Sequence, residues 1–328
     1  MQQPLVSIIS VHFNEPEATQ EMLVSLRSCR YKRKEIIVVD NGSSKGNIQN
    51  LVNEFQEVLF LKSNKNLGFA GGNNLALPFI KGEYVFFLNN DAIVSPETIE
   101  KLVGFLETTP KAGMVSPLIF FPKQEQEERF RVQFAGTTRV HPITGRNESI
   151  GKYGFDFGQF NRPQEIPYPH GAAMMVRKSM IEQIGSMSED FFLYYEELDW
   201  ACRATRNDWQ IWLEPEAKVI HQESLATGAD SAFKTYYLDR SRILFMQRNQ
   251  SKMNFLGFLA FYLFLVFPKD VIRNLLRNKS DIIRAKWKAI AWNLNHIFEK
   301  QQIVSPKNVT ITALLPLSKS FHFKANVE

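Results

Sequence analysis

The sequence predicts an α/β domain with a central sheet, followed by a helical C-terminal region. Short apolar runs typical of buried parallel strands alternate with helical patterns, as at residues 5–11, 35–39 and 84–88. Each run ends in a polar loop, and ligands of an open α/β sheet bind at the carboxyl ends of its strands. We therefore expect residues 1–225 to carry the functional site and residues 226–328 to form the helical region.

The composition is that of an ordinary folded protein. The chain has 328 residues, of which 44% are hydrophobic and 22% charged, so it can bury a large core. Cys29 and Cys202 lie far apart without the spacing of a metal site, and no signal peptide precedes the first strand. These features predict reduced, cytoplasmic surroundings. The formal charge of +5 is modest, and we expect no nucleic-acid partner.

The first two strands predict a βαβ unit. Residues 5–11 are followed by Pro16, which suits the first turn of a helix, and residues 35–39 run into Asp40. An acidic residue at this point can hydrogen-bond a ribose or a base. The loop after the first strand lacks G-x-G-x-x-G, and the chain has no G-x-x-x-x-G-K-[ST] motif. Nicotinamide dehydrogenases and P-loop NTPases are therefore disfavoured.

A glycine-rich segment follows the third predicted strand, residues 58–61. Its glycines, at residues 68–72, allow a ligand to approach the backbone, and the helix that they open has free N–H groups for phosphate oxygens. A tight turn explains the same glycines without any ligand.

The fourth strand, residues 84–88, runs directly into Asn89, Asn90 and Asp91. A carboxylate beside two amides at a strand end is suited to a hard divalent cation. The alternative is an Asx turn before the helix that begins near residues 95–97.

Four segments together resemble a known family. Residues 6–14, 38–43, 66–73 and 88–91 resemble the nucleotide-sugar half of family 2 glycosyltransferases, in the branch that includes bacterial rhamnosyltransferases. The resemblance implies a GT-A type, Rossmann-like domain with a mixed central sheet, here with a C-terminal helical region. It also implies a binding site for a nucleotide-sugar donor, formed by Asn14, Glu15, Asp40, Gly71, Gly72, Asn73, Asn89 and Asn90.

The resemblance implies that Asp91 binds Mn²⁺ or Mg²⁺ bridging the donor diphosphate. Asn89 stands where the commoner D-x-D motif has its first acidic residue, so only one carboxylate is present there. Another predicted strand ends at His221, where the family often has a metal-binding histidine, and imidazole is a common ligand of transition metals. We expect His221 to be the second ligand, which favours Mn²⁺; a surface histidine is the alternative.

Residues 191–200 bring aromatic side chains up against three carboxylates. This clustering is electrostatically unfavourable unless a cation or a catalytic role offsets the repulsion, although acidic residues also favour a helix N-terminus. The run resembles the family motif E-D-x-D, whose second acidic residue is the general base. In this chain that position is Glu197 and not an aspartate, so either the acceptor lies slightly further away or Glu196 takes part. We expect Glu197 to be the catalytic base.

The acceptor side is predicted from neighbouring residues. We assign His170, Asp199 and Trp200 to acceptor binding, and we expect Asp199 to pair with Arg203 one helical turn later. The irregular residues 121–169 are expected on the same side.

Two arginines further along the chain have alternative roles. Arg240 and Arg242 could contact the diphosphate or lie on a solvated helix face. The absence of Q-x-x-R-W argues against a processive synthase.

Residues 255–267 are apolar and uncharged, but a transmembrane helix needs roughly 20 residues. Pro268 and Lys269 are expected to end this run. Basic residues follow, at Arg273, Arg277, Lys279, Arg284, Lys286 and Lys288. The pattern predicts an interfacial anchor at the inner face of the cell membrane; a helix buried against the domain or in a dimer interface is the alternative.

The predicted function is a metal-dependent, inverting, non-processive glycosyltransferase. Its donor would be dTDP-rhamnose or a UDP-hexose, and its acceptor a bacterial surface glycan or a lipid-linked glycan. A nucleotidyltransferase is disfavoured because residues 13–16 carry no glycine, lysine or arginine. A non-catalytic scaffold of polysaccharide assembly that keeps the fold is the remaining alternative. The sequence does not determine the oligomeric state.

Overall fold

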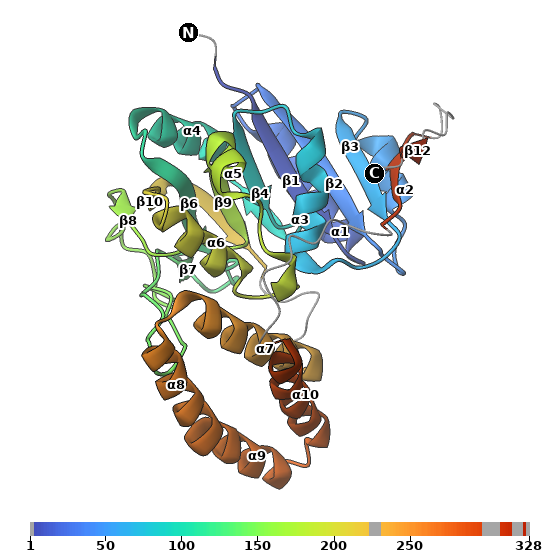
Figure 1. Cartoon of the computed structure of the whole chain (residues 1–328). Coiled ribbons are helices and arrows are strands. Elements are labelled where there is room, and N and C mark those ends of the chain that lie inside the picture. Colours follow the sequence, from blue (N-terminus) through green and yellow to red (C-terminus); the bar gives the residue numbers. More distant parts are fainter. Residues whose placement is uncertain (1–2, 223–230, 297–308, 317–323, 326–328) are drawn as a thin grey trace.

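The structure, a computed structural model, describes residues 3–222, 231–296, 309–316 and 324–325. Its centre is a mixed sheet with the strand order β12-β11-β3-β2-β1-β4-β9-β6-β10-β5, with β7 paired to β6 and β8 to β10 (Figure 1). The strands are β1 (Val6–His12), β2 (Lys34–Asn41), β3 (Val58–Ser63), β4 (Tyr84–Leu88), β5 (Ala92–Val94), β6 (Ala112–Phe120), β7 (Val132–Phe134), β8 (Gln164–Glu165), β9 (Ala173–Arg177), β10 (Gln210–His221), β11 (Ile311–Leu314) and β12 (Lys324–Ala325).

Helices pack on the sheet and continue into the C-terminal part. They are α1 (Pro16–Ser28), α2 (Ile48–Glu54), α3 (Gly68–Ala76), α4 (Thr98–Thr108), α5 (Lys178–Ile184), α6 (Glu196–Thr205), α7 (Ala232–Asn249), α8 (Lys252–Phe261), α9 (Phe267–Leu276) and α10 (Ser280–His296). Short non-α turns are η1 (Leu77–Phe79), η2 (Glu189–Phe191) and η3 (Tyr262–Val266). The α/β architecture with a mixed sheet is as predicted.

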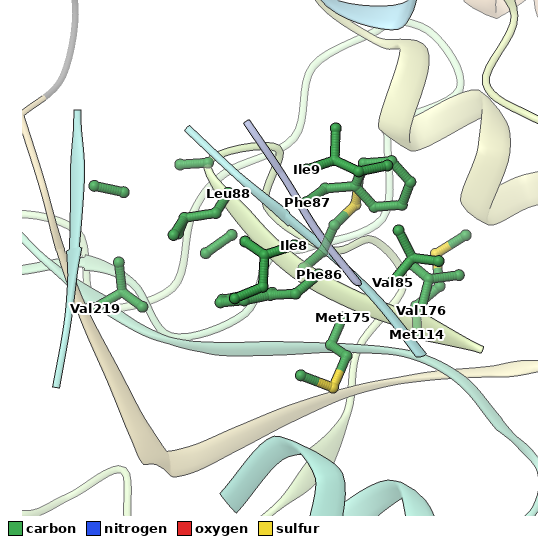
Figure 2. Packing of buried hydrophobic residues seen from close by; sticks show 14 of the residues in the cluster. Ile8, Ile9, Val85, Phe86, Phe87, Leu88, Met114, Met175, Val176 and Val219 are labelled. Carbon is green, nitrogen blue, oxygen red and sulfur yellow. The ribbon is translucent and has the colours of Figure 1, made fainter. Parts of the chain in front are cut away.

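The strands β3, β2, β1 and β4 are parallel neighbours, so their carboxyl ends meet at one edge. Apolar side chains on both faces explain why they are central: all five residues of β4 are buried, and Phe86 and Phe87 are at most 1% exposed. Figure 2 shows these side chains packed with Ile8 and Ile9 of β1. The polar residues that follow each strand are therefore held by a rigid core.

The other half of the sheet is mixed, and its strand β6 was not predicted. All nine residues of β6 are buried, and the strand pairs antiparallel with β9 and parallel with β10. The last residues of β10 also pair with β5, which sets His221 opposite Ala92. This pairing brings the end of β10 to the end of β4.

The helices α7 to α10 form a ring below the sheet domain in Figure 1. Residues Lys252–Leu276 form one continuous helix of 25 residues, so the prediction that Pro268 ends it is wrong. The missing N–H of Pro268 is accommodated by the π-helical turn η3, in which the Phe267 N–H donates to the Tyr262 carbonyl. By length and composition this helix could cross a membrane, although a single such helix is weak evidence for a membrane span. Only 17% of its most apolar window is buried inside the molecule.

The division at residue 225 falls among residues 223–230, outside the described residues. The last part of the chain departs from the helical prediction, because β11 returns to the sheet and pairs antiparallel with β3. The sheet therefore takes strands from both ends of the sequence.

Candidate active site

Asp91 and His221 meet at the carboxyl edge of the sheet. The Nε2 atom of His221 lies 3.1 Å from Oδ1 of Asp91 and 3.3 Å from Nδ2 of Asn89. On the other side of the ring, the Nδ1–H of His221 donates to Oε1 of Gln133 at 2.8 Å. This bond leaves Nε2 as the acceptor atom of the ring, beside the Asp91 carboxylate and the Asn89 amide.

This corner fits a divalent cation. Oδ1 of Asp91 is buried and accepts no hydrogen bond within the described part of the chain, and it lies 3.1 Å from Nε2 of His221. A cation would satisfy this oxygen, and carboxylate with imidazole is a donor set suited to Mn²⁺. Residues 3–222, 231–296, 309–316 and 324–325 contain no group of three His, Cys, Asp or Glu side chains placed to bind a metal. The other ligands would therefore be water and the substrate diphosphate.

Asn89 and Asn90 hold the turn that presents Asp91. The Asn89 N–H donates to the Ala172 carbonyl at 2.9 Å, and Nδ2 of Asn90 donates to Oγ1 of Thr19 at 3.1 Å. Both bonds tie the end of β4 to its neighbours. The geometry thus gives the two asparagines a positioning role beside the carboxylate.

Glu196 and Glu197 begin helix α6 after a strained loop. Phe192, Tyr194 and Tyr195 all have positive φ angles, of 60°, 69° and 72°, which bulky residues rarely adopt. Such strain persists where the surrounding structure imposes it, and it concentrates at functional sites. The loop turns the N-terminus of α6, with its two carboxylates, toward the sheet edge.

Burial makes both glutamates unusual acids. It raises the pKa of Glu197 to about 7. Burial and the neighbouring charge of Glu197 raise the pKa of Glu196 well above its ordinary value. The Oε2 atom of each accepts no hydrogen bond among the described residues. A carboxylate with a pKa near 7 is matched to general-base catalysis.

His170 lies between the two groups. Its ring centroid is 5.9 Å from that of His221, and a Cβ placed on the adjacent Gly171 would lie 3.6 Å from Oε1 of Glu197. Nδ1 of His170 accepts the Ala172 N–H at 3.1 Å, and burial lowers the pKa of His170 to about 3. The ring is therefore neutral and has an Nε2–H donor. Asp91, His221, His170 and Glu197 thus converge on one region.

The predicted nucleotide residues lie at the ends of β1 and β2. Oδ1 of Asn14 accepts the backbone N–H groups of Ser44 and Lys45, both at 2.9 Å, so its amide oxygen is occupied by the loop. Glu15 is partly exposed and precedes α1. Asp40 is 1% exposed, and its Oδ1 accepts the Ser43 N–H. Its Oδ2 accepts no hydrogen bond among the described residues but lies 3.6 Å from Nζ of Lys62, so a ligand would share this oxygen with the lysine.

Gly71, Gly72 and Asn73 lie inside α3 and are buried. A Cβ on Gly72 would meet Val11 at 2.9 Å, and Nδ2 of Asn73 donates to the Phe69 carbonyl within the helix. These contacts give Gly72 and Asn73 a role in packing α3 against β1.

The structure corrects the acceptor assignment of Asp199 and Trp200. Trp200 is fully buried, and its Nε1–H donates to the Gly185 carbonyl at 2.8 Å. The oxygens of Asp199 accept from Arg203 at 3.2 Å and from Asn249 at 2.8 Å, so its predicted pairing with Arg203 is present. Neither side chain is free to meet an acceptor, because both are committed to holding α6.

Arg240 is buried against the rings of Tyr236, Tyr237 and Trp292, the last centred 4.2 Å from its guanidinium carbon. It also donates to the Asp190 carbonyl, and its positive charge favours ionisation of Glu196. It is therefore not on a solvated helix face.

Gln133, which orients His221, was missed because it lies in the irregular residues 121–169, and a lone glutamine carries no sequence signal.

Comparison with known proteins identifies relatives. The family model described as Glycosyl transferase family 2 matches residues 7–185. A low-salt glycan biosynthesis hexosyltransferase of Haloferax volcanii is 28% identical over 248 residues, covering 73% of this chain and 74% of that protein. An N-acetylglucosaminyl-diphospho-decaprenol L-rhamnosyltransferase of Mycobacterium tuberculosis is 24% identical over 264 residues, covering 75% and 85%.

Solved structures support the fold. GalNAc-T7 with UDP, GalNAc and Mn²⁺ matches with a TM-score of 0.58 and 13% identity, over 73% of this chain and 48% of that one. A mannosyltransferase from Pyrobaculum calidifontis in complex with GDP-Man and Mn²⁺ matches with a TM-score of 0.52 and 14% identity, over 92% and 89%. The predicted GT-A fold is confirmed.

Proposed function

The chain belongs to glycosyl transferase family 2, and from that premise we propose that it is a metal-dependent, inverting, non-processive hexosyltransferase of glycan biosynthesis. The observation that carries the proposal is the buried Oδ1 of Asp91, which accepts no hydrogen bond among the described residues and lies 3.1 Å from Nε2 of His221. Such a pair at the carboxyl edge of the sheet is suited to a cation that the donor diphosphate also binds. A divalent cation held there would stabilise the negative charge that develops on the departing diphosphate.

Glu197 supplies the general base in this proposal. Its carboxylate takes the proton from an acceptor hydroxyl as that oxygen bonds to the anomeric carbon of the donor sugar. The bond from the anomeric carbon to the diphosphate breaks on the opposite face, so the configuration inverts. The pKa of about 7 makes Glu197 basic enough to accept the proton and leaves a large fraction of it ionised at neutral pH. The neutral His170, next in sequence to the glycine that Glu197 approaches, has an N–H donor suited to orienting the acceptor.

The donor and acceptor classes follow from the site and the relatives. We propose dTDP-rhamnose or a UDP-hexose as donor, with Asp40, Asn14 and Glu15 near the base and ribose. We propose a surface glycan or lipid-linked glycan as acceptor, because one relative is named for a diphospho-decaprenol acceptor. The enzyme would then work at the cytoplasmic face of the cell membrane.

Calorimetric titration of UDP and dTDP, with and without Mn²⁺, tests the donor site. We expect one nucleotide to bind in a metal-dependent manner, and Asp91→Asn to abolish that dependence. Asp208→Asn, an exposed carboxylate just after α6, is the matched control and is expected to bind like the native protein. If the native protein bound neither nucleotide and transferred no sugar, a non-catalytic scaffold would replace this proposal.

A further inference from the structure

A cationic cavity lies within the C-terminal part, away from the sheet edge. Its volume is about 250 Å³, and α7, α9, α10 and the loop that contains Arg146 enclose it. Six basic side chains line it, with only two carboxylates: Arg146, Arg242, Arg273, Arg277, Lys279 and Lys286 with Asp239 and Asp270. A neighbouring cavity of about 770 Å³ shares Arg146, Asp270 and Arg273 with it. An excess of positive charge in a concave site attracts an anion.

The two carboxylates are already used by the protein. Nζ of Lys286 lies 2.6 Å from Asp239 and 2.9 Å from Asp270, and it is buried, so the prediction that Lys286 faces lipid is wrong. Arg273 also pairs with Asp270, at 2.9 Å. Arg146 and Arg277, in contrast, have no carboxylate partner in the part of the chain that the structure describes. Their guanidinium groups are available for a ligand, and guanidinium matches phosphate oxygens in a bidentate manner.

The cavity is connected to the catalytic helix. Nε of Arg242, on its wall, donates to the hydroxyl of Tyr195 at 3.1 Å, and that hydroxyl donates to the Gly145 carbonyl at 3.0 Å. Tyr195 immediately precedes Glu196 and Glu197. Arg242 and Tyr195 thus link the wall of the cavity to the residue that precedes the two glutamates.

An apolar surface leads away from the two cavities. The larger one is lined partly by Phe261, Leu265 and Val266, and Phe264 next to them is 77% exposed. In Figure 1 the green segment of the sheet domain that includes residues 138–148 reaches the ring of helices, and residues of this segment line the larger cavity. A cationic cavity thus lies beside an apolar surface, which is the arrangement that an anionic lipid headgroup and its hydrocarbon chain require.

We propose that this cavity binds the diphosphate that joins the acceptor sugar to its lipid carrier. The proposal rests on the proposed function, since it names the class of acceptor: a sugar on a prenyl diphosphate. Arg146 and Arg277 neutralise the diphosphate oxygens without a metal ion, and the prenyl chain leaves along the apolar residues of η3. The sugar beyond the diphosphate is directed toward Glu197.

Titration of inorganic pyrophosphate in the presence of EDTA tests the cavity, because the chelator removes metal-dependent binding at Asp91. We expect the double variant Arg146→Gln, Arg277→Gln to bind about a hundredfold or more weakly, since each of the two charged hydrogen-bonding groups contributes roughly tenfold or more. Arg284→Gln is the matched control, because Arg284 is an exposed arginine of α10 outside the cavity. Equal binding by the native protein and the double variant, or an equal loss in the control, would overturn the proposal.

A second arm separates a lipid diphosphate from free pyrophosphate. Farnesyl diphosphate is expected to bind at least tenfold more tightly than pyrophosphate and to compete with it, whereas farnesol should not compete. If farnesyl diphosphate bound no better than pyrophosphate, the lipid assignment would be wrong. If vesicles of phosphatidylglycerol competed as well as farnesyl diphosphate, the site would be a general anionic surface, which also contradicts the proposal.

The glycosyltransferase proposal and the cavity proposal can be disproved independently. Nucleotide binding with Mn²⁺ is expected to be unchanged in the double variant, because Arg146 and Arg277 lie outside the Asp91 corner. Loss of pyrophosphate binding with normal nucleotide binding supports the cavity assignment. Normal pyrophosphate binding in a native protein that binds no nucleotide would sink the glycosyltransferase mechanism, and with it the acceptor role of the cavity.

Discussion

Glu197 is the residue on which the proposed chemistry depends, and its environment predicts a pH profile. Burial raises its pKa to about 7, and only the ionised form can accept the acceptor proton. We expect kcat/KM for the acceptor to fall about tenfold per pH unit below that pKa and to level off above it. Initial rates measured between about pH 5.5 and 8.5, on both sides of that pKa, check this.

Substitution of the base gives the corresponding loss. Glu197→Gln is expected to lower kcat roughly 100- to 10,000-fold while nucleotide binding stays the same. Glu100→Gln, on the exposed side of α4, is the matched control. The pKa of Glu197 in the folded protein lies above its ordinary value, so the ionised carboxylate destabilises the folded state. The free energy of unfolding therefore falls as the pH rises through about 7. Glu197→Gln should therefore raise Tm at pH 8; an active variant with unchanged Tm would contradict the assignment.

Gln133 is expected to control the metal ligand without touching the metal. Its Oε1 accepts the Nδ1–H of His221, which fixes the tautomer that leaves Nε2 free. Gln133→Met keeps the length of the side chain and removes the acceptor, so Mn²⁺ affinity should fall about 10- to 100-fold. Electron paramagnetic resonance of free Mn²⁺ in the presence of UDP measures it. Gln20→Met, at an exposed position of α1, controls for the substitution; unchanged affinity would exclude His221 as a ligand oriented by Gln133.

At the scale of elements, the loop that precedes α6 depends on one glycine of α3. Gly68 has a φ of +72°, and a Cβ there would lie 2.1 Å from the carbonyl oxygen of Phe192. That carbonyl accepts the Phe69 N–H at 2.7 Å, so the start of α3 and the strained loop before Glu197 are bonded together. The active-site loop is thus held in place by α3 rather than by its own sequence.

Two glycine substitutions test this dependence in opposite directions. Gly68→Ala should lower the unfolding free energy by more than about 1 kcal/mol and reduce kcat, because the loop that positions Glu197 must move. A Cβ added to Gly104, inside α4, would meet no atom of the described residues within 4 Å, so Gly104→Ala should raise stability by about 0.5–1 kcal/mol with normal activity. Urea denaturation and initial rates measure both. A Gly68→Ala protein as stable and active as Gly104→Ala would contradict the coupling.

The elements that local pattern determines were predictable, and those that tertiary contacts determine were not. β4 and its polar end were readable because an apolar run stops abruptly at Asn89. β6 is buried along its whole length and has a proline within it, which hides it as a strand. The sequence predicts a helix end at Pro268, but the π-turn of η3 accommodates the proline. Trp200 lies three residues after Glu197, yet its position on the helix turns it into the core.

At the scale of the whole molecule, a buried polar network holds the ring of helices together. Oδ2 of Asp239 on α7 accepts from Lys286 of α10 at 2.6 Å and from the hydroxyl of Tyr262 in η3 at 2.8 Å. Lys286 also pairs with Asp270 of α9. A buried network of this kind is stable only when its members are satisfied together, so it favours one arrangement of the four helices. That arrangement leaves the apolar residues of α8 and α9 on the outside.

Those outer residues predict how the enzyme contacts a membrane. Leu256, Phe264 and Leu276 are 58%, 77% and 82% exposed, and none of them lines the cationic cavities. Burying each in a membrane is worth roughly 1.5 kcal/mol or more, so replacing all three by serine should weaken binding to phosphatidylcholine vesicles about a thousandfold or more. Flotation with vesicles measures this, while nucleotide and pyrophosphate binding should be retained.

A second copy of the chain is the competing occupant of this apolar surface. Light scattering of the native protein in mild detergent distinguishes the two, because a membrane-bound enzyme should be monomeric there, whereas a subunit interface should give a dimer. A dimer that dissociates when Leu256, Phe264 and Leu276 are replaced, together with no flotation of the native protein, would assign the surface to self-association. Since the same helix borders the cavity proposed for the diphosphate, vesicle binding by the native monomer would place the cationic site at the lipid headgroups, where a prenyl diphosphate presents its sugar.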